Sequence, residues 1–255
     1  QMDLTVADYL HHLKDDPAIE VFAVYLEGFQ PLDGARFVAA AAEIAASGRT
    51  VVLYRGGRTA AGAAAAASHT AAVAGDHAIG RQLAAAAGVV IADTLEDFED
   101  LVRLFVRLRD RHPRGLRLGA VSNAGYECVA IADHLGPFSL AAWSAATRSR
   151  LEATLERSRL AGIVGVRNPI DLTPILGDEG TEAATRAVLE DDGTDAAIVG
   201  LVPLTGALVT LACGEGHDDD LERDDGIVKR LVRLRAEIAK PWVAVVDARA
   251  LYDPM

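Results

Sequence analysis

The sequence predicts an α/β fold made of two tandem domains, each built on a parallel β-sheet. Short apolar runs with the length of buried strands alternate with segments whose apolar residues recur at helical spacing. Parallel strands need crossover helices, which cover both faces of the sheet. Residues 112–115 interrupt this alternation, and a new strand, loop and helix follow. We therefore place the domains at residues 1–112 and 113–255.

The first domain is predicted to begin with a helix that Thr5 and Asp8 cap in a capping box. Further helices are expected around residues 37–45 and at about residues 76–87, and Thr94 caps a long fourth helix. Strands are expected at residues 19–26, 50–54 and 89–91.

The second domain repeats this alternation. Strands are predicted at residues 116–122, 138–141, 196–202 and 242–246. Helices are predicted from the turn at 123–125 to about residue 135, around Leu151 and Leu155, and at about residues 178–189 and 223–239. The segment 168–172 is predicted to be a rigid loop, since Pro169 fixes its own φ and restricts Asn168.

The composition is globular and limits the possible partners. Apolar residues make up 51% of the 255 residues, and the formal net charge is −12. An acidic chain repels phosphate backbones, so we expect no nucleic-acid partner. Two cysteines give no disulfide framework, which favours a cytoplasmic location, and neither a signal peptide nor a membrane-spanning run is found. Both ends look cut, so we interpret the chain as a piece of a longer polypeptide, truncated at its C-terminus.

A segment of small residues at 62–75 follows the predicted strand 50–54 and contains one histidine, His69, between Ser68 and Thr70. Small residues let backbone amides approach a ligand closely, and a helix start beyond them favours an anion. We interpret the segment as a packed loop in which His69 is a candidate nucleophile toward a phosphoryl group. A surface or helix-capping histidine is the alternative, and it stays open.

Two other strand ends supply candidate partners for His69. Glu27 follows the strand 19–26, next to the strand 50–54 if sequential strands pair, so its carboxylate is placed to orient an imidazole. A solvated strand-end carboxylate is an equally good interpretation of Glu27. The turn Asn123-Ala124-Gly125 starts a second helix, whose amides would reach the same phosphate if the two domains face each other.

Several motifs, in this order, resemble the NDP-forming acyl-CoA synthetases, which are ADP-forming acetate–CoA ligases and relatives of succinyl-CoA synthetase. The motifs are residues 25–28, 51–62, 68–70 with 74–76, 122–125 with Asp133, 168–174, and 245–247 with 252–254. The resemblance covers almost the whole chain. It implies the two tandem flavodoxin-like, parallel-sheet middle domains of such an enzyme.

The resemblance implies a reaction sequence. Acyl-CoA and phosphate give an acyl phosphate and CoA, and the acyl phosphate passes its phosphoryl group to a histidine, which then phosphorylates ADP or GDP. His69 matches the phosphorylated histidine, and Glu27 matches the carboxylate that orients it. The helix starts that follow the two loops match the pair that stabilises phosphohistidine. The matched phosphate-binding positions are Ser68, Thr70, Asn123, Ala124 and Gly125.

The resemblance also implies partners outside this chain. The CoA-binding Rossmann domain and the ATP-grasp domain of the family, which binds nucleotide and Mg²⁺, have no counterpart here. We expect CoA, ATP or ADP, and Mg²⁺ to bind through those domains, on the same or a partner chain, and the isolated chain to be inactive. Acyl-CoA, acyl phosphate and phosphate are the expected small ligands, and a homo-oligomer is compatible with the sequence.

Three residues depart from the family pattern. Ala71 replaces a glycine after Ser-His-Thr, Tyr126 replaces a second glycine after Asn-Ala-Gly, and Arg55 replaces a common lysine. Tyr126 has the bulk to crowd a phosphate, so a non-catalytic module that senses acyl-CoA or another effector is a competing hypothesis. A flavodoxin-like domain with unrelated chemistry is a third. No metal site is expected, because His217 and the three following aspartates are interpreted as a solvated acidic loop.

Overall fold

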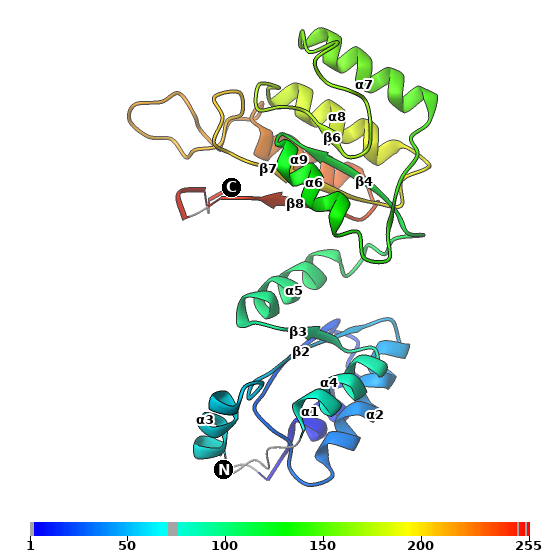
Figure 1. Cartoon of the computed structure of the whole chain (residues 1–255), viewed down its shortest axis with the longest axis vertical. Helices are drawn as coiled ribbons and strands as arrows, with labels where there is room; N and C mark the ends of the chain where they lie inside the picture. Colours follow the sequence, from blue (N-terminus) through cyan, green and yellow to red (C-terminus); the bar gives the residue numbers. More distant parts are fainter. Residues whose placement is uncertain (1–2, 71–75, 249, 253) are drawn as a thin grey trace. The chain divides into compact units, whose positions relative to one another are not determined.

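The computed structural model describes residues 3–70, 76–248, 250–252 and 254–255 of the chain. It separates into two compact units, Gln1–Asp110 and Arg111–Met255 (Figure 1). Both units consist of parallel strands with helices packed on them, which confirms the predicted α/β class.

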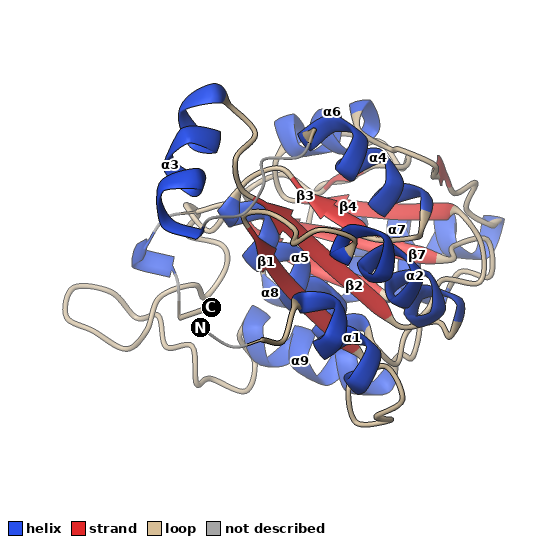
Figure 2. Cartoon of the chain, turned by 90° about the horizontal axis from the view of Figure 1, so that it is seen from below, coloured by secondary structure: helices blue, strands red, loops and turns tan. Residues whose placement is uncertain are grey.

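Unit 1 contains α1 (Val6–Leu13), β1 (Val21–Leu26), α2 (Asp33–Ala46), β2 (Thr50–Arg55), α3 (Ala60–Thr70), α4 (His77–Ala86), β3 (Val90–Ala92) and α5 (Leu95–Leu108). Its three strands lie side by side in the order β1-β2-β3, all parallel (Figure 2). Leu26 pairs with Arg55, so the carboxyl ends of β1 and β2 coincide. The expected pairing of sequential strands, on which the candidate role of Glu27 depends, is confirmed.

Helices cover both faces of the unit 1 sheet. α1, α2 and α4 pack on one face, and α5 lies on the other (Figure 1). The core on the first face buries Phe37 and Ile44 of α2 against Val51 and Leu53 of β2. The predicted capping box of Thr5 and Asp8 begins α1, and Thr94 caps α5 as expected.

Unit 2 contains β4 (Arg117–Ser122), α6 (Gly125–Asp133), β5 (Ser139–Leu140), α7 (Ala145–Arg157), β6 (Ile170–Asp171), α8 (Asp178–Glu190), β7 (Ala196–Leu201), α9 (Ile227–Glu237), β8 (Trp242–Val246) and the 3₁₀ helix η1 (Ala250–Tyr252). The strand order is β5-β4-β7-β8, again parallel, and β6 also pairs with β4. Two buried clusters fill this unit, one under α7 and α8 and one under α9. Because these strands are parallel, the carboxyl ends of β4, β6, β7 and β8 lie at the same edge of the sheet.

Two predicted segments differ from the structure. The sequence predicts a loop at residues 62–75, but Ala60–Thr70 form the helix α3. This prediction is wrong over the described residues, because alanine has the highest helix propensity and a run of alanines outweighs one glycine. The predicted rigid loop 168–172 contains the short strand β6, which forms because Ile170 and Leu172 are buried and the Leu172 amide donates to the Ser122 carbonyl oxygen at 2.8 Å.

Candidate functional site

Glu27 lies at the carboxyl edge of the unit 1 sheet, directly after β1. The Gly56 amide donates to the Leu26 carbonyl oxygen at 2.9 Å, so the chain that leaves β2 runs beside the chain that leaves β1. A Cβ atom built on Gly56 would lie 3.7 Å from Glu27 Cγ, which is ordinary van der Waals contact. The half-buried Glu27 side chain therefore lies next to Gly56, at the point where the segment leading to α3 begins.

A row of aromatic rings supports this carboxylate. The Tyr25 hydroxyl donates to Glu27 Oε1 at 3.0 Å, and this bond raises the pKa of the Tyr25 phenol. The Tyr25 ring centroid lies 5.7 Å from that of Tyr54, which lies 6.4 Å from that of Phe98 on α5. A carboxylate accepts several hydrogen bonds. Among the described side chains, Tyr25 is the donor to Glu27, whose carboxylate keeps acceptor capacity for a second donor, such as an imidazole N–H.

His69 lies in the last turn of α3, between Ser68 and Thr70. The side chains of residues 67–70, and residues 71–75 with Ala71, lie outside the described part of the structure. The start of α3 is well defined, because Thr59 Oγ1 accepts the Gly62 amide at 3.1 Å. Gly57 has a φ of +79°, which favours glycine, and turns the chain into this helix. A short turn therefore connects the neighbour of Glu27 to the helix that carries His69.

The start of α4, which was expected to offer amides to an anion, is already capped. The Asp76 carboxylate accepts the amides of Ala78 at 2.8 Å and Ile79 at 3.1 Å. The Asp76 side chain therefore occupies these amide donors and places a negative charge at the helix start, which disfavours a second anion there. Arg55 crosses to this helix and donates to the carbonyl oxygens of Asp76 at 3.1 Å and His77 at 3.4 Å. The role of Arg55 in the described structure is to tie β2 to α4.

The turn at residues 123–125 connects β4 to α6 at the carboxyl edge of the unit 2 sheet. The buried Asn123 side chain donates to the Val202 carbonyl oxygen at 2.9 Å and accepts the Val202 amide at 2.8 Å. The amide of Ala124 donates to Ser122 Oγ at 3.0 Å. Within the described chain no side chain caps α6. Asn123 therefore fixes the turn, and the uncapped first amides of α6 remain its candidate anion donors.

Three carboxylates surround this helix start. The Tyr126 hydroxyl donates to Asp247, which raises the pKa of Tyr126 to about 12. A Cβ atom on Gly125 would come within 2.9 Å of Asp171 Oδ2, so a side chain there would displace the Asp171 carboxylate. The third is Glu127, which is buried and accepts from the Ser122 hydroxyl. Burial raises the pKa of the Glu127 carboxyl, and the charge of Asp247 adds to this effect.

Sequence reasoning assigned no role to these acidic residues. Asp171 and Asp247 belong to the motifs that carry the resemblance, and Glu127 was not singled out. The available signal was position, because Asp171 ends β6 and Asp247 follows β8 at the edge where ligands of parallel sheets bind. Within the described residues, no group of three His, Cys, Asp or Glu side chains is arranged to hold a metal ion.

Comparison with known proteins supports the resemblance. The family model described as "succinyl-CoA ligase like flavodoxin domain" matches residues 1–105. The chain is 29% identical over 217 residues to the α subunit of an ADP-forming acetate–CoA ligase of Pyrococcus furiosus, covering 84% of this chain and 45% of that subunit. The chain is homologous to the ADP-forming acetate–CoA ligases. The predicted resemblance is confirmed.

Two further proteins are similar to this chain. An ADP-forming acetate–CoA ligase of Archaeoglobus fulgidus is 31% identical over 205 residues, covering 77% of this chain and 28% of that protein. A trans-feruloyl-CoA synthase from an unknown prokaryote is 28% identical over 221 residues, covering 80% of this chain and 28% of that protein. The chain therefore spans less than half the length of these proteins.

A solved structure agrees with the homology. The dinucleotide-forming acetyl-coenzyme A synthetase of Ca. Korarchaeum cryptofilum, in complex with phosphate and ADP, matches with a TM-score of 0.76 and 25% identity. The match covers 98% of this chain and 50% of that one, which confirms the flavodoxin-like fold class. None of the helices among the described residues has the length and apolar character needed to cross a bilayer.

Proposed function

We propose that this chain is the phosphoryl-transfer part of an NDP-forming acyl-CoA synthetase. The observation that carries the proposal is the position of Glu27 beside Gly56, at the start of the turn that leads into the helix with His69. The homology with acetate–CoA ligases supports it. The names of two relatives print different acids, acetate and a trans-feruloyl group, so the proposal extends only to the formation of acyl-CoA and not to one acyl group.

In the proposed reaction, a neutral ring nitrogen of His69 attacks the phosphorus of an acyl phosphate. The P–O bond to the acyl group breaks, a P–N bond forms, and the carboxylate leaves. Glu27 accepts the N–H of the other ring nitrogen, which fixes the tautomer and stabilises the positive charge that develops on the ring. A nucleoside diphosphate oxygen then attacks the phosphorus, the P–N bond breaks, and His69 returns to its neutral form.

The phosphoryl group needs donors around it in both steps. We propose the hydroxyls of Ser68 and Thr70 for this in unit 1. In unit 2 the candidate donors are the first uncapped amides of α6, from Gly125 on, because the Ala124 amide already donates to Ser122 Oγ. The Asn123 side chain acts through the turn that it fixes, since both of its polar atoms bond to Val202. CoA, the nucleotide and Mg²⁺ would be supplied by other domains, on the same or a partner chain, in a cytoplasmic enzyme.

Phosphate labelling tests the proposal. The chain is complemented with the CoA-binding and ATP-grasp domains of an acetate–CoA ligase and incubated with γ-labelled ATP. We expect acid-labile, base-stable label that is lost in His69→Ala and retained in His12→Ala, because His12 lies in the last turn of α1. Label that persists unchanged in His69→Ala would contradict the proposal.

The charges around α6 favour a second candidate, a non-catalytic module that senses acyl-CoA or another effector. Asp171 and Asp247 oppose the binding of a phosphate dianion at this helix start, and the bond to Asp247 anchors Tyr126 there. Calorimetry separates the two hypotheses. Tight binding of CoA by the chain alone, without labelling of His69, supports the sensor, whereas labelling without CoA binding supports the transferase.

A further inference from the structure

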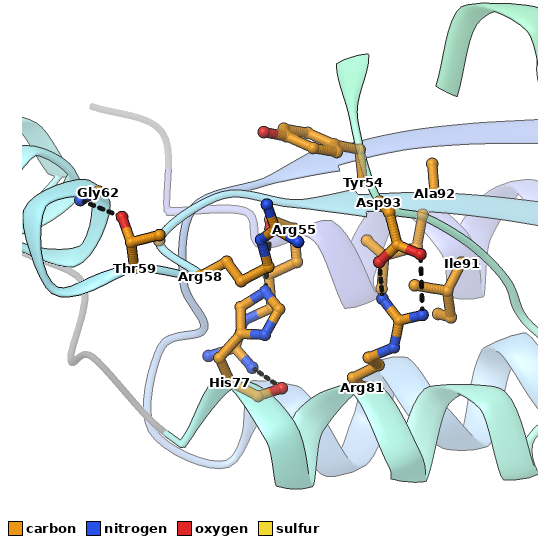
Figure 3. Close-up of a pocket in the computed structure, with 12 residues that line it drawn as sticks. Tyr54, Arg55, Arg58, Thr59, Gly62, His77, Arg81, Ile91, Ala92 and Asp93 are labelled. Carbon is orange, nitrogen blue, oxygen red and sulfur yellow. Dashed lines mark hydrogen bonds and ion pairs between the residues drawn. The ribbon is translucent and has the colours of Figure 1, made fainter. Parts of the chain in front are cut away.

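We infer that unit 1 contains a separate anion site that binds the dianionic phosphoryl group of a free phosphate or a small phosphate ester. The site is a cavity of about 180 Å³ at the carboxyl ends of β2 and β3 (Figure 3). Its lining comes from the end of β2, the turn before α3, the first turns of α4 and the end of β3. Neither Glu27 nor the turn at residues 123–125 lines it, so this inference goes beyond the proposed function.

The cavity is positively charged. Arg55, Arg58 and Arg81 are among the described residues that line it, and Asp93 is the one carboxylate among them. This leaves two positive charges in excess, which matches a phosphoryl group that carries about two negative charges near neutral pH. Arginine also pairs with phosphate through two parallel N–H donors. Charge and donor geometry both select this ligand class over a neutral one.

Arg58 is the cation that is available to a ligand. It lines the cavity, its side chain is exposed, and it makes no hydrogen bond or ion pair with the residues that the structure describes (Figure 3). Arg81 is held instead by Asp93, with one donor at 3.2 Å and a second, shorter contact. Arg81 mainly, and Arg58 to a lesser degree, lower the pKa of the Asp93 carboxyl. Both guanidinium groups therefore act on the same small region, where Asp93 competes with a bound anion.

The back of the cavity is preorganised. His77 Nε2 lies 3.1 Å from the carbonyl oxygen of Arg55, so this nitrogen carries the proton. The Arg55 side chain in turn donates to the carbonyl oxygen of His77 at 3.4 Å. These reciprocal contacts hold β2 and α4 at a fixed spacing without any ligand. Binding an anion there costs little reorganisation.

One wall of the cavity is apolar, which points to an organic body on the phosphoryl group. The side chains of Leu53 and Ile91 lie on this side, whereas the Tyr54 ring faces Phe98 of α5 on the other face of the sheet (Figure 3). Thr59 and Gly62 of the first turn of α3 form another side. The Thr59 oxygen accepts the Gly62 amide, which leaves its hydroxyl proton free to donate to an anion. A ligand in this cavity would thus contact the start of the helix that carries His69.

Titration of the ¹⁵N-labelled chain by NMR tests the inference. The probes are inorganic phosphate and phenyl phosphate, at constant ionic strength. We expect saturable shifts of the amides of Thr59, Gly62 and Arg81, with phenyl phosphate binding more tightly than phosphate because its ring contacts the apolar wall. Shifts at the amides of residues 123–127 report the site of the proposed function instead, so the two can fail separately.

Three variants are expected to change the phosphate affinity in different directions. Arg58→Ala should weaken phosphate binding roughly ten-fold or more, as expected for loss of a charged hydrogen-bond donor. Asp93→Asn should tighten it, because it removes the competing carboxylate and frees Arg81. Arg103→Ala is the matched control, since Arg103 is exposed on α5 and pairs only with Glu99 and Asp100 among the described residues. It should leave binding unchanged.

The outcomes are decisive in either direction. Weakening by Arg58→Ala together with tightening by Asp93→Asn supports the site, since a merely destabilised fold would not bind more tightly. Equal losses in Arg58→Ala and Arg103→Ala would show unspecific attraction and overturn the inference. Absence of saturable shifts at Thr59, Gly62 and Arg81 would overturn it as well.

Discussion

At the scale of single residues, a carboxylate paired with a tyrosine marks the carboxyl edge of each sheet. Tyr25 donates to Glu27 after β1, and Tyr126 donates to Asp247 after β8. A phenol that donates to a carboxylate holds its proton more tightly, so the pKa of both tyrosines is raised. These pairs give each carboxylate a fixed position before any ligand arrives.

The tyrosine pKa values test these contacts directly. Replacing Asp247 with Asn removes the charged acceptor, so the pKa of Tyr126 should fall from about 12 toward the ordinary value of about 10. Resonances of the tyrosine ring carbons, followed by NMR through a pH titration, measure this. Glu27→Gln is the matched control, which should lower the pKa of Tyr25 only. A Tyr126 pKa near its ordinary value in the unsubstituted chain would refute the contact.

Glu127 makes the stability of unit 2 depend on pH. Burial raises the pKa of its carboxyl above the unfolded value of about 4.3. Between these two pKa values the native state binds the extra proton, so the free energy of unfolding falls as pH rises through this window. Glu127→Gln should flatten this fall, because an amide does not titrate. The amide oxygen still accepts from Ser122, so the local contact is kept.

Urea unfolding followed by tryptophan fluorescence measures this dependence. Both tryptophans, Trp143 and Trp242, are buried in unit 2, so the signal reports this unit. Glu190→Gln is a suitable control, since Glu190 is a more exposed partner of Arg150 at the end of α8. An equal fall with rising pH in the Glu127→Gln variant and in the unsubstituted chain would contradict the account.

At the scale of elements, α3 is the segment in which the structure differs from the sequence-based prediction. Small residues before a histidine were taken to indicate a loop, but eleven residues from Ala60 to Thr70 form a helix. The same alanines allow close backbone approach and favour helix, and their helix propensity decides the outcome. Thr59, whose hydroxyl caps the Gly62 amide, was the signal that would have located its start.

A proline in α3 tests the helix. Ala64 is exposed, so Ala64→Pro changes the backbone without disturbing a core, and proline in a helix interior costs about 3 kcal/mol or more. We expect the helical ¹³Cα shifts of residues 60–66 to collapse in this variant. Ala64→Gln, a good helix former, should retain them. Random-coil shifts for this segment in the unsubstituted chain would show that α3 is not a helix in solution.

The strands were predictable because their signals are local and strong. The run at residues 242–246 and the apolar stretch at 50–54 became β8 and β2 nearly unchanged. The site was predictable only where it depends on strand order. Pairing of β1 with β2 puts Glu27 next to the end of β2, as expected. The Asn123–Val202 and Tyr126–Asp247 contacts instead join residues 79 and 121 positions apart in sequence, which no local pattern contains.

At the scale of the whole molecule, each unit has its own buried core and its own carboxyl edge. Phe37 and Ile44 anchor unit 1, and Leu151, Leu172 and Leu234 anchor unit 2. The chain covers half of the Ca. Korarchaeum cryptofilum synthetase chain that it matches. The proposed chemistry therefore assigns to this chain the phosphoryl carrier and its orienting carboxylate, and assigns CoA and nucleotide to other domains.

The most direct measurement of the central claim is the site of phosphorylation. Peptide mass spectrometry under neutral conditions, applied to the complemented enzyme after incubation with ATP, locates the phosphoryl group. We predict phosphohistidine at His69, formed roughly a hundred-fold more slowly in Glu27→Gln, because the amide no longer stabilises the imidazole in its reactive form. A phosphoryl group on another residue, or labelling of His69 at an unchanged rate in Glu27→Gln, would contradict the account.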